Sequence, residues 1–131
     1  DDDQWMVISP ENFDRYTPWV KAFAAADTEQ IVQAYARLYP LFQQAYQELG
    51  YPDARFNDRV IAVIDDLLAA PEIDEPVRLV RPHVLFQFAD PALEARSAGQ
   101  KTLIRMGREN AAVVKAKLRE IRTSISAQPP R

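Results

Sequence analysis

A regular apolar stripe near the C-terminus constrains the fold more than any other feature. Its members recur at intervals of four, three and four residues, at Val114, Leu118, Ile121 and Ile125. This spacing is typical of one face of an α-helix. Gly107 interrupts the helical pattern upstream, so we predict a helix that begins near Arg108 and buries the stripe. The remaining faces of this helix carry basic side chains, at Lys115, Lys117, Arg119 and Arg122.

A second helix is predicted directly before this one. Asp90-Pro91 combines an acidic N-cap with proline at the first helical position. One face of the predicted helix carries small or apolar residues, at Ala92, Ala95, Gly99, Leu103 and Met106. Gly99 costs a helix about 1 kcal/mol relative to alanine, and close packing by another helix would explain it. The stretch Phe88–Ile125 is therefore predicted as a helical hairpin that the rest of the chain packs around.

Upstream of this hairpin, helical patterns alternate with proline and glycine breaks. The predicted elements are a short turn near residues 10–16 and helices over Thr17–Ala25, from an Asp27 or Thr28 cap to Gly50, and from an Asn57 or Asp58 cap to Pro71. A kink or break is expected at Pro40, because proline removes an intrahelical hydrogen bond. The tyrosines at helical spacing, Tyr35, Tyr39 and Tyr46, are interpreted as core residues.

The segments between and outside the helices have weaker patterns. Residues 1–9 are interpreted as an extended N-terminal segment and as a truncated start, and residues 126–131 as a disordered tail. Residues 77–88 are predicted as an irregular crossing over the helices, because Pro82 cannot continue a central strand. The fold class is all-α: a single-domain helical bundle of about five helices over residues 10–125.

Composition and charge exclude several classes of protein. The chain has no cysteine, so it forms neither a disulfide nor a thiolate metal site. The net charge of -3 combines a net of -10 in residues 1–75 with a net of +6 in residues 101–131. The basic last helix either folds back on the acidic half or offers a surface to an anionic partner. Nucleic acid is not an expected partner, because the chain is acidic and carries no recognisable binding motif.

No catalytic constellation is visible in the sequence. His83 is the single histidine and has no partner for a metal or a nucleophile, so a structural role is favoured. Asp65 and Asp66 are adjacent and would point about 100° apart on a helix, which does not make a catalytic pair. A polar set along the Asp90 helix, at Glu94, Ser97, Lys101 and Arg105, is interpreted as a salt-bridged face, because serine–lysine chemistry needs a cleft with oxyanion donors. No cofactor and no metal are expected.

Three segments together, LGYPD, FADPALE and QKTLIRMGRENA, resemble the bacterial domain-of-unknown-function family 3014. The resemblance covers the chain from about Trp5 to Ile125. It implies a periplasmic domain of an envelope protein that is held to the inner membrane by an N-terminal anchor absent from this sequence. It carries over no activity and no catalytic residue.

These observations leave three hypotheses for the function. The first is a non-enzymatic protein-binding or scaffolding module of the bacterial cell envelope, with an envelope protein as its partner. Its candidate binding surface comprises Arg81, His83, Glu94, Lys101, Arg105, Lys115, Arg119 and Arg122.

The second hypothesis is a helical domain that binds a small molecule or a lipid. Its pocket would lie among Tyr35, Tyr39, Tyr46 and Phe86, with Arg81 or His83 at the mouth. An unrecognised hydrolase that uses Glu94, Lys101 or Asp65 is the least favoured.

Overall fold

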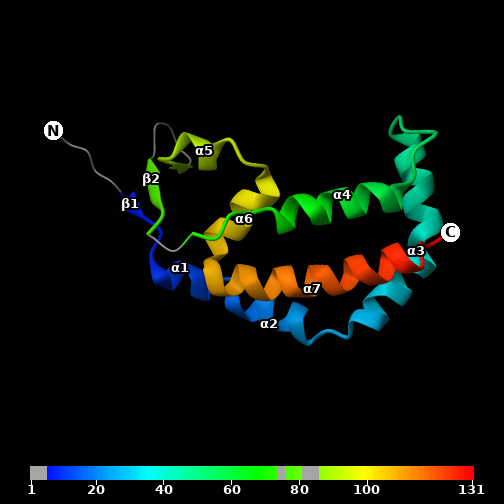
Figure 1. Ribbon diagram of the computed structural model, residues 1–131, viewed down its shortest axis with the longest axis horizontal. Helices are drawn as coiled ribbons and strands as arrows, with labels where there is room; N and C mark the ends of the chain where they lie inside the picture. The colour runs from blue at the N-terminus through cyan, green and yellow to red at the C-terminus, as the bar shows by residue number, and fades with distance from the viewer. Residues whose placement is uncertain (1–5, 74–75, 81–85) are drawn as a thin grey trace.

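A computed structural model describes residues 6–73, 76–80 and 86–131 (Figure 1). The elements in chain order are β1 (Met6–Val7), α1 (Pro10–Asp14), α2 (Thr17–Ala25), α3 (Thr28–Glu48), α4 (Phe56–Leu68), β2 (Arg78–Val80), β3 (Gln87–Phe88), α5 (Pro91–Glu94), α6 (Ala98–Met106) and α7 (Arg108–Ala127). Within the described residues, five of the helices have nine residues or more. The predicted single-domain, mostly helical bundle of about five helices is confirmed.

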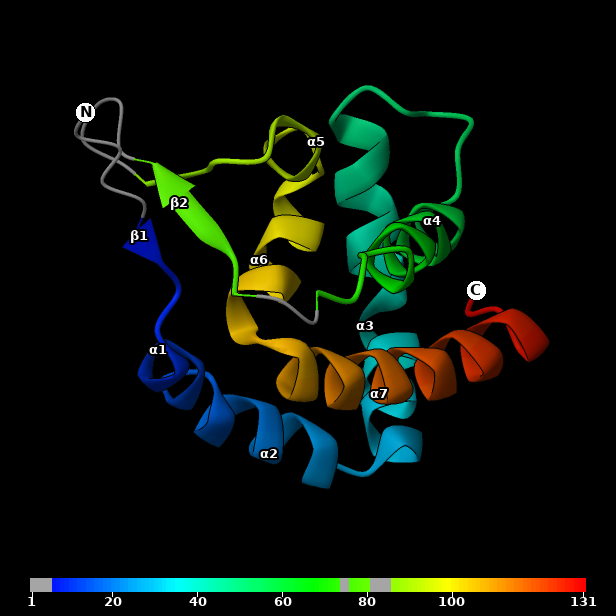
Figure 2. The same cartoon turned by 60° about the vertical axis from the view of Figure 1, so that its left-hand side comes forward.

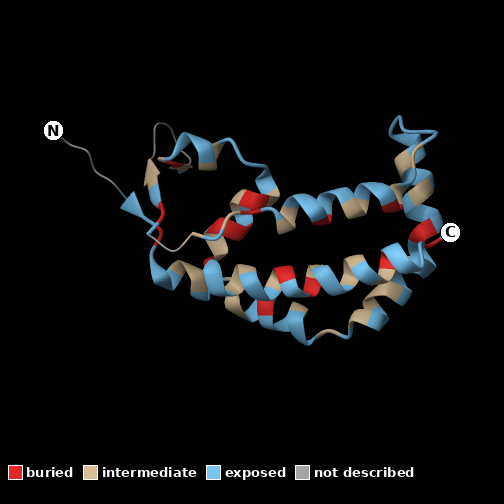
Figure 3. Cartoon of the chain, in the orientation of Figure 1, coloured by how far each residue is buried: buried red, intermediate tan, exposed pale blue. Residues whose placement is uncertain are grey.

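The last helix, α7, lies at the centre of the bundle. It contacts α2, α3, α4 and α6. Figures 1 and 2 show α2 and α4 on opposite sides of it, and Figure 1 shows α3 beside its C-terminal end. The predicted start at Arg108 is confirmed, and Ile125 of the predicted stripe is among the most buried residues. Buried positions follow α6 and α7 and the inner faces of their neighbours (Figure 3).

Two lysines of α7 are buried rather than exposed to solvent. Lys115 and Lys117 are only 6% and 7% exposed. The Lys115 ammonium donates to the carbonyl of Ala70, just after the end of α4, and the Lys117 ammonium donates to the carbonyl of Ala26, at the end of α2. Helix C-termini carry unpaired carbonyls and a partial negative charge, and neither α2 nor α4 has a basic residue in its last turn. The two lysines therefore cap neighbouring helices.

Ion pairs join α7 to the acidic half of the chain. Arg122 binds Asp65 of α4 through two contacts, Nε to Oδ1 at 2.6 Å and a second nitrogen to Oδ2 at 3.2 Å. The hydrogen bonds from Arg122 lower the pKa of the Asp65 carboxyl below its usual value. Arg108 lies 3.7 Å from Glu72. Of the two interpretations of the charge asymmetry, these pairs support the one in which the basic helix folds back on the acidic half.

The helix boundaries predicted between residues 10 and 50 agree with the structure. The turn near 10–16 is α1, and the next helix covers Thr17–Ala25 as expected. The Asp27 side chain accepts hydrogen bonds from the amides of Glu29 and Gln30 and so caps α3. Gly50 follows α3 with a φ of 115°. However, α3 continues through Pro40 as one helix, so of the predicted kink or break at that residue, the break is not present.

Asn57 does not cap α4, which was the role predicted for it or for Asp58. The helix begins at Phe56, and Asn57 is 2% exposed. Its Oδ1 accepts from the Tyr35 hydroxyl at 2.9 Å, and its Nδ2 donates to the Ile125 carbonyl at 3.2 Å. The Asn57 amide is thus used to join α3, α4 and α7, because all three helices meet around it.

A small antiparallel sheet was not predicted. Its strand order is β1-β2-β3, with Met6 opposite Leu79 and Leu79 opposite Phe88. The interpretation of residues 77–88 as an irregular crossing is therefore wrong for β2 and β3. The strand β2 is central, and it ends at Val80, before Pro82, so the restriction that proline places on a central strand is respected. Within the described part of the predicted N-terminal extended segment, Met6 and Val7 pair with β2.

The predicted helix from Asp90 to Met106 is two helices. α5 starts at Pro91 with the Asp90 side chain as its cap, and it ends after Glu94. Ser97 then caps α6, because its hydroxyl accepts from the Gln100 amide. The predicted close packing at Gly99 is confirmed, since a Cβ there would lie 2.5 Å from the Cδ2 atom of Leu67 on α4.

The C-terminal residues are in part packed, although residues 126–131 were predicted as a disordered tail. α7 extends to Ala127. Pro130 is buried, and its carbonyl accepts from Arg55 at 2.8 Å. Across the described parts of the chain, none of the helices has the length and apolar character required to cross a bilayer.

Candidate binding cleft

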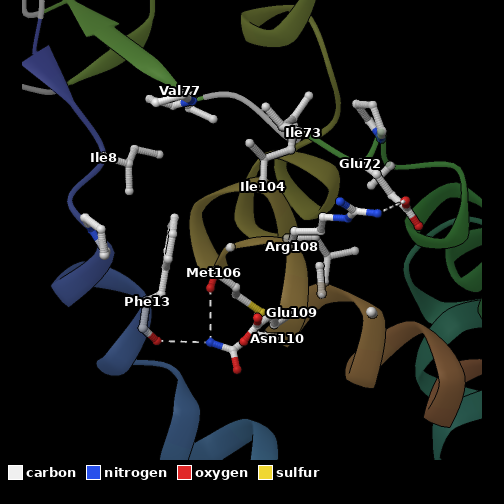
Figure 4. Close-up of a pocket in the computed structure, with 18 of the residues that line it drawn as sticks. Ile8, Phe13, Glu72, Ile73, Val77, Ile104, Met106, Arg108, Glu109 and Asn110 are labelled. Carbon is white, nitrogen blue, oxygen red and sulfur yellow. Dashed lines mark hydrogen bonds and ion pairs between the residues drawn. The ribbon is translucent and has the colours of Figure 1, made fainter.

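A cleft of about 700 Å³ opens where the sheet side of the molecule meets the α6–α7 junction. One side is formed by residues 7–14, which run from β1 into α1. A second side is formed by residues 70–73 and 76–77, which lead from α4 towards β2. Residues around Gly107 close the third side (Figure 4).

The walls of the cleft are mainly apolar. They include Ile8, Phe13, Ile73, Val77, Ile104 and Met106. Three of these residues, Ile8, Val77 and Ile104, belong to a buried core cluster that also contains Phe88. The cleft is therefore a place where the core between the sheet and α6 opens to the surface.

Gly107 gives the cleft its shape. Its φ of 90° lies in the region that favours glycine, and it turns the chain from α6 into α7. A Cβ atom at this position would lie 2.7 Å from the ring of Phe13. Only glycine lets the Phe13 ring lie against this turn and form one wall.

Asn110 holds the α1, α6 and α7 segments together beside the cleft. Its Nδ2 donates to the carbonyls of Phe13 and Met106, both at 3.0 Å (Figure 4). A longer contact of 3.3 Å reaches the Thr17 hydroxyl. The Met106 carbonyl ends α6 and has no helical partner, so the amide satisfies a group that the glycine turn leaves open.

The rim of the cleft carries charges of both signs. Asp14, Glu72, Arg108 and Glu109 contribute to it, and Arg108 is paired with Glu72. Deeper in the cleft, the Lys115 ammonium is bound to the Ala70 carbonyl. Both cations among the described lining residues are therefore engaged within the protein.

The polar set predicted along the Asp90 helix forms a salt-bridged face, as expected. Glu94 lies 3.4 Å from Lys101, and its Oε2 accepts from the Phe88 amide at 2.7 Å. This backbone hydrogen bond, together with Lys101, lowers the pKa of the Glu94 carboxyl below its usual value. The Arg105 guanidinium lies 4.8 Å from the centre of the Phe88 ring. The face thus ties α5 and α6 to the end of β3.

Of the three residues considered for a hydrolase, two bind each other and the third, Asp65, has a separate partner. Asp65 binds Arg122, whereas Glu94 binds Lys101 at the junction of α5 and α6. Ser97 donates to Oδ2 of Asp66 at 2.5 Å and caps α6. In the described residues, no group of three or more histidine, cysteine or acidic side chains is arranged to hold a metal ion.

One residue of the predicted binding surface, Lys115, is not accessible to a partner. Arg81 and His83 lie outside the described residues. Lys115 is buried, Arg122 is ion-paired with Asp65, and Arg119 is exposed. Lys115 is not available to a partner, because its side chain is buried and its ammonium binds the Ala70 carbonyl at the end of α4.

The predicted aromatic pocket is filled by its own side chains. Tyr35 and Tyr39 pack edge to face at 5.6 Å, and Tyr46 stacks on Tyr51 at 4.7 Å between ring centres. The interpretation of these tyrosines as core is supported. Phe86 lies elsewhere, in a smaller hollow of about 420 Å³ that also contains Met6 and Leu79. The larger cleft was not predicted from the sequence. The one residue that could have indicated it is Gly107, which was recognised only as a break between two helices.

The comparison with known families gives one match. The family model described as "Protein of unknown function (DUF3014)" matches residues 1–122. No curated protein and no solved structure matches the chain.

Proposed function

Since the chain belongs to DUF3014, a family of proteins of unknown function, we propose a function from its structure. We propose that the domain is a non-enzymatic binding module of the bacterial cell envelope. Its cleft beside Gly107 takes an apolar segment of a partner protein. The observation that carries this proposal is the apolar cleft itself, which opens from the core to the surface.

The size and lining of the cleft support such a ligand. Its volume is within the roughly 300–1,000 Å³ typical of ligand sites, which suffices for a few apolar side chains. An apolar centre with a charged rim is also the usual layout of a protein interface. An anionic lipid headgroup fits less well, because Arg108 and Lys115 already have partners inside the protein.

The location in the envelope rests on the resemblance, which implies a periplasmic domain tied to the inner membrane. In that setting the partner is another envelope protein, and the anchor keeps the cleft close to the membrane. No chemical step is required of the domain.

Photocrosslinking in cells tests the proposal. A photoreactive amino acid replaces Glu109 at the rim of the cleft in the anchored, full-length protein. Ala112 lines the cleft and is exposed, so Ala112→Trp narrows the cleft with little effect on folding. Ala116 is exposed on the same helix, outside the cleft lining, which makes Ala116→Trp the matched control.

A specific protein should crosslink to the rim, disappear with Ala112→Trp and persist with Ala116→Trp. The proposal is overturned if Ala112→Trp leaves the crosslinked protein unchanged, or if no protein is crosslinked from the rim. A second candidate function, binding of a small apolar molecule, is favoured by the cleft volume alone. Native mass spectrometry would support it by finding a bound molecule that Ala112→Trp removes.

A further inference from the structure

A second apolar surface lies on α3, away from the cleft. Its exposed large side chains are Leu38, Leu41, Phe42 and Leu49, with 45%, 64%, 39% and 77% of their surface accessible. Together with the exposed Ala34 and Ala45 they follow one face of the helix. We call this face the outer stripe, defined by Ala34, Leu38, Leu41, Phe42, Ala45 and Leu49.

Most of the outer stripe is distinct from the face that α3 turns to the core; Phe42 lies at the boundary, where its ring also packs 5.6 Å from that of Phe56. Tyr39 is buried and donates to Gln43, which in turn accepts from the Phe56 amide of α4. Leu41 is two residues from Tyr39 and therefore lies about 200° around the helix from it. Figures 1 and 3 show α3 at one end of the molecule with much of its surface exposed. Contiguous exposed apolar surface of this kind marks an interaction site.

The charges around the outer stripe indicate what covers it. Residues 38–47 form the longest uncharged run of the sequence, with 10 residues. Arg37 and Glu48 stand at its two ends. They are eleven residues apart, so they lie within about 20° of each other on the same side of the helix. The stripe is therefore neutral along its length and carries opposite charges at its ends.

We propose that the outer stripe binds a second copy of this chain, with the two α3 helices antiparallel. A two-fold axis midway between Phe42 and Gln43 places each Arg37 opposite Glu48 of the partner subunit. The ion pair forms twice, as the symmetry of a closed dimer requires. A parallel arrangement would instead place like charges opposite each other at both ends. The neutral stripe also lets two acidic proteins approach without repulsion between them at the contact.

The dimer is expected to be weak. The stripe from Leu38 to Leu49 extends about 16 Å along one helix, and such a contact is smaller than the roughly 800 Å² per partner of a standard interface. We therefore expect weak association, with a dissociation constant on the order of tens of micromolar, because a small contact leaves little free energy after the cost of association. This inference does not depend on the function proposed for the cleft, since the two surfaces share no residue.

Sedimentation equilibrium over a concentration series tests the dimer. The wild type should shift from monomer to dimer, and Leu41→Glu should remain monomeric because it places two carboxylates near the axis. Val113 is similarly exposed, on α7, so Val113→Glu is the control and should dimerise like the wild type. A wild type that stays monomeric at every concentration overturns the proposal and indicates a different protein on this face.

Single cysteines test the orientation, because the chain has none of its own. In the antiparallel pair, the two copies of residue 41 are offset by about 4.5 Å along the helix axis, and the two copies of residue 49 by about 20 Å. Leu41→Cys should therefore crosslink with a short bifunctional reagent, and Leu49→Cys should not. Equal crosslinking at both positions would indicate parallel helices and refute the antiparallel arrangement.

Discussion

Replacing Asn57 by leucine tests whether this residue joins three helices. Leucine has a similar size, but its side chain neither donates nor accepts hydrogen bonds. The Tyr35 hydroxyl and the Ile125 carbonyl would each lose a partner. The Ile125 carbonyl lies in the last turn of α7, where no later amide of the helix can replace Asn57.

The expected loss follows from these two groups. Leaving a buried polar group unpaired costs about 1–3 kcal/mol, and the partly buried Tyr35 hydroxyl belongs at the low end of this range. Asn57→Leu should therefore lower the free energy of unfolding by about 2–4 kcal/mol. For a domain of this size the melting temperature should fall by roughly 10 °C.

Urea unfolding followed by circular dichroism measures this loss. Tyr35→Phe removes one of the two contacts and should cost about 1 kcal/mol. The double variant should lose less than the sum of the two, because both changes remove the same hydrogen bond. Asp58→Ala, at the exposed neighbouring residue, should cost less than about 1 kcal/mol. A loss below about 1 kcal/mol for Asn57→Leu, or full additivity with Tyr35→Phe, would refute the role assigned to Asn57.

Two further predictions concern backbone conformation and pH. Gly107→Ala should lower the melting temperature more than Gly50→Ala. Both residues have a positive φ, but only at Gly107 would an added Cβ lie within 2.8 Å of ring carbons of Phe13. Equal decreases in the melting temperature would contradict this. Burial raises the pKa of Tyr35 to about 12 from 10.0, so its neutral form stabilises the fold below pH 10.0, and this contribution is lost as the pH rises towards 12. Between pH 10.0 and about 12, the free energy of unfolding, measured with urea, should fall less for Tyr35→Phe than for the wild type. Equal falls in the two proteins would contradict this role of Tyr35.

Elements with strong local signals could be predicted from the sequence. Asp27 caps α3, Gly50 follows its end, and Gly107 separates α6 from α7. In each case one residue and its immediate neighbours determine the backbone. The resemblance to family 3014 is likewise confirmed by the family match.

Features that depend on distant residues could not be predicted. The strands β1 and β2 are only two and three residues long and pair across about seventy residues of sequence. Asn57 is a typical cap residue, yet its amide is used by Tyr35 and Ile125 from other helices. Lys115 appears as a surface charge in the sequence, because the carbonyl it binds belongs to the end of α4. The cleft is formed by three segments that are far apart in the sequence. No single stretch of the sequence could therefore indicate it.

The position of α7 in the chain has a consequence for the biosynthesis of the domain. α7 supplies the surface on which α2, α3, α4 and α6 pack, and its lysines complete the ends of α2 and α4. A nascent chain that has emerged from the ribosome only as far as Met106 has helices without their common partner. Those helices are marginal alone, since most helical stability comes from tertiary packing. Folding of this domain can therefore be completed only after residues 108–127 have been synthesised and have emerged from the ribosome.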